Sequence, residues 1–444
     1  MVDFNAMYRR CLFWLRDYFK GSPIRSHYVE LKKIQESSFD ECKELRNSKL
    51  RSLLIHAQEN SKFYSEIKSL EIKDFPVVNK VLLREKFDEV RVAYDKIPGQ
   101  RGDLHIQTTS GSTGIPFAVP QDTNKRNRRI AELKYYGKVV GFNSHEKLIH
   151  LRTWNRWQFK TPCQIKNENI IPFDISNMGD DRLRELCELI KDSKAICLRG
   201  YASSFDILAE YVKNNEYVFP KLKIIIAGSE MLHEDTRYKV KKYLRCEIIS
   251  QYANEECGIL AQEKVPTDLF GDVMYMNHAS YYFEILKLDS DTSAEYGELG
   301  RIVVTDLTNY AFPIIRYDTG DLGIMQSADK FSKGYPILIK LYGRRLDVCY
   351  TTYGEPFSPM TIGRILKHFD SILQWQFIQK AETEYTLRVV RRLSYAVDEL
   401  SIINTLKEQI GENAIINVEY VNDIPVLSSG KRKPVVNEWK NAEL

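Results

Sequence analysis

Between about Leu104 and Ile285, short apolar runs alternate with longer amphipathic stretches. Continuous apolar runs are typical of parallel strands buried on both faces, and here they are Lys147–Leu151, Ala195–Leu198, Lys223–Ala227 and Cys246–Ser250. The stretches between them have a helical period and include Arg182–Lys191, Ser203–Lys213 and Glu234–Tyr243. This alternation predicts an α/β fold built from βαβ units with parallel strands.

The pattern changes after Tyr281, where predicted strands follow one another through turns. These strands are Tyr282–Leu286, Gly300–Thr305 and Ile337–Leu341. The C-terminal part then mixes predicted helices, Met360–His368 and Ala396–Ile410, with predicted strands, Gln374–Gln379, Thr386–Val390 and Ile415–Tyr420. We therefore expect a large domain of parallel and mixed sheets with a β-rich subregion over residues 1–343. A small, mobile α+β domain follows over residues 344–444.

The first segment, Phe4–Lys20, has the pattern of an amphipathic helix. Its apolar stripe consists of Phe4, Tyr8, Cys11, Leu12, Leu15 and Phe19, and its polar face carries Arg9, Arg10, Arg16 and Lys20. Such a helix most often packs on its own domain, which is the interpretation favoured here. Peripheral association with a membrane surface is the alternative.

Two other clusters are rich in basic side chains. The run Asn124–Arg129 is interpreted as the solvated face of a helix, with binding of an anionic acceptor as the alternative. An aromatic and basic cluster after the first apolar run either lines the acyl or acceptor side of a site or packs as a strand end; it comprises His150, Arg152, Trp154, Asn155, Arg156 and Trp157.

Composition and charge narrow the class of protein. The 444 residues are 43% hydrophobic and 28% charged, which is ordinary globular composition. The net charge of +4 is far from the dense basic footprint of nucleic-acid binders, so no nucleic-acid partner is predicted. The eight cysteines form no C-x-x-C pair, which argues against a zinc ribbon or a thioredoxin-like site. No secretory signal and no apolar run of ~18 residues is recognised, so we expect a cytoplasmic protein with reduced thiols.

One loop has the composition of an anion-binding turn. It contains Thr108, Thr109, Ser110, Gly111, Ser112, Thr113 and Gly114. Glycines let the backbone approach a ligand, successive N–H groups form an anion-binding concavity, and hydroxyls add donors. No lysine follows in the Walker A spacing, which argues against a P-loop ATPase or GTPase. The loop predicts phosphate binding, and an ordinary Ser/Gly turn is the alternative.

Further segments occur in a recognisable order: Arg51–Tyr64, Phe75–Glu85, Leu198–Leu208 with its Arg-Gly-Tyr, and Gly297–Asp321, which contains Gly-Glu-x-Gly and Arg-Tyr-x-x-Gly-Asp. In this order they resemble adenylate-forming enzymes of the phenylacetate–CoA ligase branch, including its CapK-like capsular-polysaccharide members. The resemblance covers nearly the whole chain and implies that fold. It also implies formation of an acyl-adenylate from ATP and a carboxylic acid.

The segment Gln251–Glu256 resembles the family's Tyr-Gly-x-Ser/Thr-Glu motif. The resemblance places Gln251, Tyr252 and Ala253 at the nucleotide, with the tyrosine near adenine, and implies that Glu256 helps to hold Mg²⁺. Mg²⁺ prefers oxygen ligands and few protein carboxylates. Ala253 replaces the usual glycine, and Glu255 replaces the usual hydroxyl residue. Taken alone, two adjacent glutamates would indicate a solvated helix start.

Three more matches concern the nucleotide. Asp321 matches the aspartate that binds both ribose hydroxyls, and a carboxylate suits a vicinal diol because it accepts two hydrogen bonds. Gly228, Ser229 and Glu230 match the segment that lines the adenine and acyl pockets. Arg344 matches the hinge-motif arginine that contacts ribose or phosphate.

The last matches concern the hinge and the catalytic lysine. Leu346 stands where the family has its hinge pivot, and Asp347 is retained. A hinge needs only to absorb changes in φ and ψ. The substitution at the pivot is therefore expected to alter the hinge locally without abolishing domain rotation. Lys431, in Ser428–Lys433, matches the lysine that reaches the α-phosphate and the carboxylate during adenylation. A solvated basic tail is the alternative.

The chain is therefore predicted to be an ATP-dependent, AMP-forming carboxylate ligase that uses ATP and Mg²⁺. Coenzyme A, a carrier protein and a sugar amine stay open as acceptors, and the resemblance suggests capsule or surface-polysaccharide biosynthesis. The competing prediction is a catalytically inactive nucleotide-binding scaffold of polysaccharide assembly, which Ala253, Glu255 and Leu346 keep open. A serine hydrolase is unsupported because no G-x-S-x-G occurs.

Overall fold

The computed structural model describes residues 4–108, 117–153, 161–344, 349–357, 359–366, 368–369, 371–392, 397–424 and 434–439. Its N-terminal part is helical and contains α1 (Phe4–Phe19), α2 (Pro23–Glu36), α3 (Phe39–Asn60), α4 (Lys80–Glu85) and α5 (Phe87–Val90). A capping box starts α3, in which the Ser38 hydroxyl accepts from the Glu41 backbone and the Glu41 carboxylate accepts from the Ser38 backbone.

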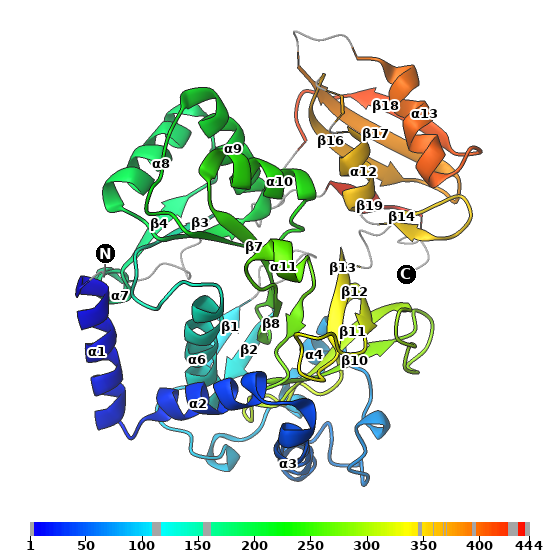
Figure 1. The fold of residues 1–444 in the computed structure, drawn as a ribbon. Coiled ribbons are helices and arrows are strands. Elements are labelled where there is room, and N and C mark those ends of the chain that lie inside the picture. Colours follow the sequence, from blue (N-terminus) through cyan, green and yellow to red (C-terminus); the bar gives the residue numbers. More distant parts are fainter. Residues whose placement is uncertain are drawn as a thin grey trace.

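A seven-stranded sheet with the order β4-β3-β5-β6-β7-β8-β9 forms the centre of the molecule (Figure 1). Its strands are β3 (Leu148–Arg152), β4 (Ile170–Asp174), β5 (Cys197–Tyr201), β6 (Ile224–Gly228), β7 (Glu247–Asn254), β8 (Gly258–Gln262) and β9 (Tyr275–Met276). The first five in this order pair in parallel, whereas β8 and β9 pair antiparallel. The four predicted apolar runs all contribute strands to this sheet, so the predicted parallel sheet is confirmed.

Helices lie on both faces of this sheet. They are α6 (Thr123–Val139), α7 (Pro162–Glu168), α8 (Asp180–Ser193), α9 (Ala202–Asn215), α10 (Glu234–Lys239) and α11 (Thr267–Phe270). Successive strand residues point to opposite faces. Accordingly, Ile225 of β6 belongs to the core that holds Leu186 of α8 and Leu208 of α9. Its neighbours Ile224 and Ile226 pack with Val140, at the end of α6.

The predicted β-rich subregion is an antiparallel sheet of β10 (Tyr281–Leu286), β11 (Leu299–Asp306), β12 (Tyr317–Gln326) and β13 (Ile337–Arg344). A separate hairpin pairs β1 (His105–Thr108) with β2 (Ala118–Gln121). One large core joins the subregion to the N-terminal segments, because Leu53 of α3 and Phe75 pack in the same cluster as Ile302 and Tyr317.

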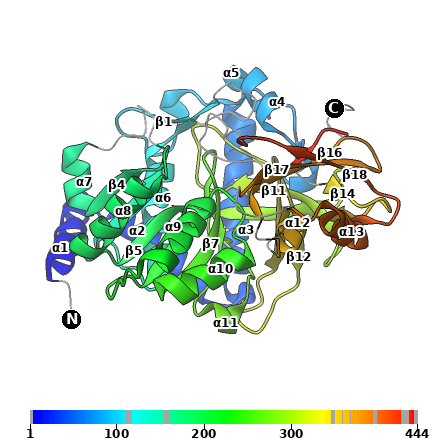
Figure 2. The same cartoon turned by 90° about the horizontal axis from the view of Figure 1, so that it is seen from above.

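The C-terminal part contains β14 (Cys349–Tyr350), β15 (Pro356–Phe357), α12 (Pro359–Leu366), β16 (Ile372–Gln379), β17 (Glu384–Arg391), α13 (Glu399–Ile410), β18 (Ile415–Tyr420) and β19 (Val435–Asn437). Its sheet has the order β18-β17-β16-β19 and its own core, in which Ile402 of α13 and Phe377 are fully buried. This unit and α1 lie at opposite ends of the molecule in both views (Figures 1 and 2). The predicted fold class is confirmed, and the boundary at residue 343 and the mobility of the small domain stay predictions.

Helix α1 packs on its own domain, as the favoured interpretation predicts, but not through the predicted apolar stripe. The predicted apolar stripe faces outward: Phe4, Tyr8, Leu15 and Phe19 are exposed, with exposed fractions of 71% for Phe4 and 78% for Phe19. The helix packs through another side instead. The Phe13 ring contacts His145, and the Asp17 carboxylate accepts from the backbone of Ile24 and Arg25 at the start of α2. No helix within the described ranges is long and apolar enough to span a membrane.

The interpretation of Asn124–Arg129 as a solvated helix face is wrong at two positions. Lys125 and Arg128 are fully buried on α6. The Lys125 ammonium lies 2.5 Å from the Asp306 carboxylate, and Arg128 pairs with Glu30 at 2.9 Å. Asp306 and Glu30 lie about a hundred residues or more away in the sequence, whereas the buried Glu132, one helical turn from Arg128, lies 3.8 Å from it. The distant partners could not be recognised from the local pattern.

Candidate active site

The predicted phosphate loop lies between two paired strands. Thr108 ends β1 and stands opposite Ala118 of β2, so the segment between them closes a hairpin. Thr109 to Gly114 lie outside the described residues. Phosphate binding by this loop therefore stays a prediction.

The predicted adenine and ribose residues meet although they are far apart in the sequence. The Tyr252 hydroxyl, on β7, donates to Asp321 Oδ2 on β12 over 2.7 Å and lies 3.2 Å from Thr319 Oγ1. Burial, together with the adjacent Asp321 carboxylate, raises the pKa of Tyr252 well above its usual value. The phenol therefore remains a protonated donor at neutral pH and orients the carboxylate predicted to bind ribose.

The predicted metal ligand, Glu256, is buried and has a cationic neighbour. Lys80, at the start of α4, places its ammonium 3.5 Å from Glu256 Oε1. Within the described residues, no group of three or more His, Cys, Asp or Glu side chains could hold a metal ion. A single carboxylate fits a Mg²⁺ ion that takes its other oxygen ligands from phosphate and water. Lys80 lies in Phe75–Glu85, one of the segments that carry the resemblance. Its position in that segment could therefore have identified it as a site residue from the sequence.

The two departures from the family motif occupy different environments. Glu255 accepts from the Gln107 amide over 2.7 Å and lies 3.9 Å from the Arg129 guanidinium, which also donates to the Glu255 carbonyl. It thus joins β1, next to Thr108, to α6. Ala253 is exposed, so its methyl group adds no volume to the core.

The segment after β6, which is predicted to line the adenine and acyl pockets, contains a residue in the left-handed backbone conformation. Gly228 ends the strand, and Ser229 has a φ of 66°, which is uncommon for a residue with a side chain and concentrates at functional sites. One Glu230 oxygen accepts from the Ser203 backbone over 3.0 Å, near the start of α9. The other oxygen is buried without a hydrogen-bond partner among the described residues.

The remaining predicted residues are only partly described. Gln251 is buried on β7 and accepts a hydrogen bond from Arg199, which belongs to the quoted Arg-Gly-Tyr motif but had no role assigned to it. Arg344 is the last residue of β13 and pairs in register with Asp321. The predictions for Lys431, Leu346, Asp347 and the cluster from Trp154 to Trp157 lie outside the described residues.

Both arginines of the segment Gly297–Asp321 are structural. Arg301 donates to Asp318 over 2.9 Å, and Arg316 pairs with Glu284 at 3.0 Å while donating to the Phe75 carbonyl. They hold the β10–β13 sheet together and tie it to the N-terminal segment. This arrangement fixes the strand from which Asp321 faces Tyr252.

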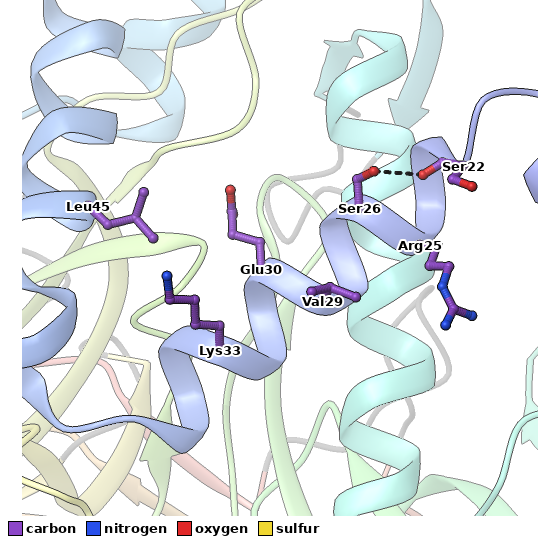
Figure 3. Close-up of a pocket in the computed structure, with 7 residues that line it drawn as sticks. All are labelled: Ser22, Arg25, Ser26, Val29, Glu30, Lys33 and Leu45. Atoms are coloured by element: carbon purple, nitrogen blue, oxygen red, sulfur yellow. Dashed lines mark hydrogen bonds between the residues drawn. The ribbon is translucent and has the colours of Figure 1, made fainter.

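A separate pocket lies beside α2 (Figure 3) and is lined by Ser22, Arg25, Ser26, Val29, Glu30, Lys33 and Leu45. None of the predicted nucleotide residues lines it. Its acidic residue, Glu30, is already paired with Lys49 at 2.5 Å and with Arg128. This pocket therefore does not belong to the candidate active site.

Comparison with known proteins adds sequence relatives. Residues 349–438 match the CapK C-terminal domain family. Protein CapK of Staphylococcus aureus is 23% identical over 448 residues, which cover 95% of either chain. Phenylacetate-coenzyme A ligase of Escherichia coli (strain K12) is 22% identical over 314 residues, which cover 66% of this chain and 69% of that ligase.

Solved structures share the fold. A 2-hydroxyisobutyryl-CoA ligase in the postadenylation state with 2-HIB-AMP has a TM-score of 0.68 at 17% identity and covers 92% of both chains. ATP-bound MatB from Rhodopseudomonas palustris has a TM-score of 0.56 at 15% identity and covers 76% of this chain and 67% of that one. The domain match, the two relatives and this shared fold agree with the resemblance to the CapK-like members of the phenylacetate–CoA ligase branch of adenylate-forming enzymes, to which this chain is similar.

Proposed function

We propose that this chain is an AMP-forming acid ligase. The observation that carries the proposal is the contact between Tyr252 and Asp321. These two residues come from separate sheets and from two independent family motifs, and both motifs imply adenosine binding. Glu256 lies four residues after Tyr252, at the end of the same strand–turn segment. The similarity to phenylacetate-coenzyme A ligase and the fold shared with solved acid–CoA ligases support the same activity.

The reaction follows from the chemistry of the acid. A carboxylate is a poor acyl donor because its leaving group would be oxide. Attack of a carboxylate oxygen on the α-phosphorus of ATP forms the mixed acyl–phosphate anhydride and breaks the bond to pyrophosphate. Both reactants are anionic, so the site must supply positive charge. A Mg²⁺ ion bound at Glu256 would neutralise phosphate charge.

The chain's own residues would then perform distinct tasks. Asp321 accepts from the ribose hydroxyls, with Tyr252 fixing its orientation. The loop from Thr108 to Gly114 holds phosphate oxygens, and Lys431 bridges the α-phosphate and the carboxylate. The small domain then rotates about the segment near Arg344. In the second step a thiol or amine acceptor attacks the acyl carbon of the adenylate, and AMP leaves.

Acid-dependent exchange of labelled pyrophosphate into ATP tests the proposal. We expect Lys431→Ala to reduce exchange by about 10²–10³-fold, the usual loss for one such electrostatic donor. Lys433→Ala is the matched control, because a merely basic tail would make the two lysines equivalent. Asp321→Asn is expected to raise KM for ATP more than KM for the acid. Binding of Mg-ATP without exchange, over a broad panel of acids, would favour the inactive scaffold instead.

The acceptor and the pathway form the second part of the proposal. The neighbouring 2-hydroxyisobutyryl-CoA ligase has been solved with 2-HIB-AMP and CoA, which favours coenzyme A as the first acceptor to assay. A carrier protein and a sugar amine are the other acceptors to compare. A role in surface-polysaccharide biosynthesis is proposed from the resemblance to the CapK-like members, and the chain is similar to Protein CapK over 95% of its length.

We also propose that α1 binds an anionic membrane surface with its axis parallel to the surface. Its outward stripe contains Phe4, Met7, Tyr8, Leu15, Tyr18 and Phe19, all exposed. Exposed basic residues, Arg16 and Lys20, flank the stripe. The only acidic residue of the helix, Asp17, is buried against the first turn of α2. An apolar face beside positive charge is the pattern of helices that lie in the interface of anionic lipid. Vesicle flotation tests this arrangement.

A further inference from the structure

Three arginines gather on the face of the central sheet that α6 covers. Arg152 ends β3, Arg199 lies within β5, and Arg129 lies on α6. Arg199 stands opposite Ile226 in the parallel register, and paired residues share a face of the sheet. Since Ile226 packs toward Val140 at the end of α6, Arg199 projects to that side as well.

Arg199 is held by a neutral partner. Its guanidinium donates to the Gln251 side-chain oxygen, and the Gln251 amide in turn donates to Gln262 over 2.5 Å. Among the described residues, no carboxylate forms an ion pair with Arg199. Burial lowers the pKa of this guanidinium, and the positive charges of Arg152 and Arg129 lower it further, whereas Cys197 and Glu255 act in the opposite direction. A largely desolvated cation without an ion-pair partner is costly, and Arg199 keeps part of its surface accessible, so this position favours an anionic ligand.

The neighbouring arginines are partly compensated. Arg129 lies 3.9 Å from one Glu255 carboxylate oxygen, which the Gln107 amide also holds. Arg152 forms a side-chain hydrogen bond with Tyr201. The charge of Arg129 is therefore paired with Glu255, whereas Arg199, among the described residues, has the neutral Gln251 amide as its hydrogen-bond partner and interacts with Glu255 only as a more distant charge.

This cluster lies next to the proposed adenylation site. Tyr201, two residues after Arg199, stands opposite Gly228, and Gly228 stands opposite Gln251. Gln251 directly precedes Tyr252, which contacts Asp321. Ligands of α/β sheets bind at the carboxyl ends of the strands, which is where Arg152 and Tyr201 end β3 and β5. An acid whose reacting carboxylate faces the nucleotide would extend its other end toward Arg199.

We infer that the substrate acid carries a second anionic group, a carboxylate, phosphonate or sulfonate, which Arg199 and Arg129 bind. This inference rests on the proposed ligase function and names the class of its acid. The planar guanidinium fork suits such oxyanions, because it donates two parallel hydrogen bonds.

Pyrophosphate exchange with matched acids tests the inference. The pairs are butyrate with succinate, valerate with glutarate, and propionate with 3-phosphonopropionate or 3-sulfopropionate, so that each anionic group is compared with a neutral chain end. We expect kcat/KM to favour the dianionic member in at least one pair. Arg199→Gln should lower that preference by about ten- to hundredfold, as for loss of a hydrogen bond to a charged group. The preference of Arg199→Lys should lie between those of the wild type and Arg199→Gln, because lysine keeps the positive charge but lacks the planar guanidinium fork.

The controls separate ligand binding from a structural role. Arg184→Gln, at an exposed site on α8, should leave the preference unchanged. A purely structural Arg199 would lower exchange with neutral and dianionic acids alike, without moving their ratio, and that result would overturn the inference. So would a wild-type preference for the neutral chain ends. In both cases Lys431-dependent exchange would still support the ligase function. If no acid gives exchange that depends on Lys431, the ligase function fails and this inference fails with it.

Discussion

The buried ion pair between Lys125 and Asp306 gives the sharpest stability prediction. Both side chains have no exposed surface, and the ammonium lies 2.5 Å from Asp306 Oδ2. The same ammonium donates to the Tyr281 hydroxyl over 3.1 Å and to Thr308 Oγ1 over 3.3 Å. The pair joins α6, which carries Arg129, to the end of β11 in the sheet that carries Asp321. Removing it should loosen the two halves of the candidate site relative to each other.

The size of the effect follows from burial. Lys125→Met keeps most of the side-chain volume but leaves the Asp306 carboxylate buried beside an apolar group. Breaking a buried pair in this way costs about 3–5 kcal/mol. The matched control is Lys241→Met: Lys241 Nζ also lies 2.5 Å from its partner, Asp268, but the side chains are 51% and 76% exposed. An exposed pair contributes about 0–1 kcal/mol, so the control should change little.

Guanidinium denaturation followed by far-ultraviolet circular dichroism measures the difference. We expect the transition midpoint of Lys125→Met to fall well below those of the wild type and of Lys241→Met. The double variant Lys125→Met/Asp306→Leu should recover part of the loss, because it removes the uncompensated carboxylate. Equal midpoints for the two lysine variants would refute the argument that burial sets the cost.

Two further predictions concern acid stability and α1. Burial, followed by the charge of Lys134, lowers the pKa of His145 to about 4, so the folded state binds fewer protons than the unfolded state below the ordinary value near 6.5. Its stabilising contribution is therefore present above pH ~6.5 and is lost as the pH falls toward 4. His145→Asn, which tolerates the φ of 70°, should show a smaller fall in urea midpoint between pH 7 and 5, and an unchanged fall would contradict this assignment. For α1, the wild type should float with phosphatidylglycerol vesicles, whereas a variant with Phe4, Leu15 and Phe19 changed to serine should not. Leu400→Ser, at another exposed apolar site, is the control. Failure of the wild type to bind the vesicles would exclude the membrane role.

The sequence predicted the central sheet well because its strands are local features. Ile224, Ile225 and Ile226 form an unbroken apolar run. A strand buried on both faces of a sheet can be recognised from such a run without knowledge of the rest of the chain. The β-rich subregion and the C-terminal helices and strands were predicted for the same reason. The apolar stripe of α1 predicted a helix equally well. It could not show which side of the helix packs, since Phe13 and Asp17 are held by groups on other elements.

The charged residues were harder to place because their partners are distant. Lys125 and Arg128 look solvated within Asn124–Arg129, and their burial depends on the distant Asp306 and Glu30, with Glu132 as a further partner of Arg128. The contact of Tyr252 with Asp321 was expected only through the family resemblance, since 69 residues separate them. Arg199 was part of a quoted motif without an assigned role. Its position opposite Ile226 and its contact with Gln251 become visible only when the sheet is assembled.

The departures from the family motif are compatible with an active enzyme. If Glu255 were a product of decay, its carboxylate would be expected to point into solvent without consequence. Instead it accepts from Gln107, one residue before Thr108, and faces Arg129. It therefore connects the strand that leads into the phosphate loop with the helix that borders the arginine cluster. A hydroxyl at this position could not neutralise Arg129. Glutamate at this position partly balances Arg129 and leaves Arg199, with Arg129 beside it, as the main cation for the second anionic group of the acid. The departure from the family pattern and the inferred dianionic substrate therefore have a common electrostatic explanation.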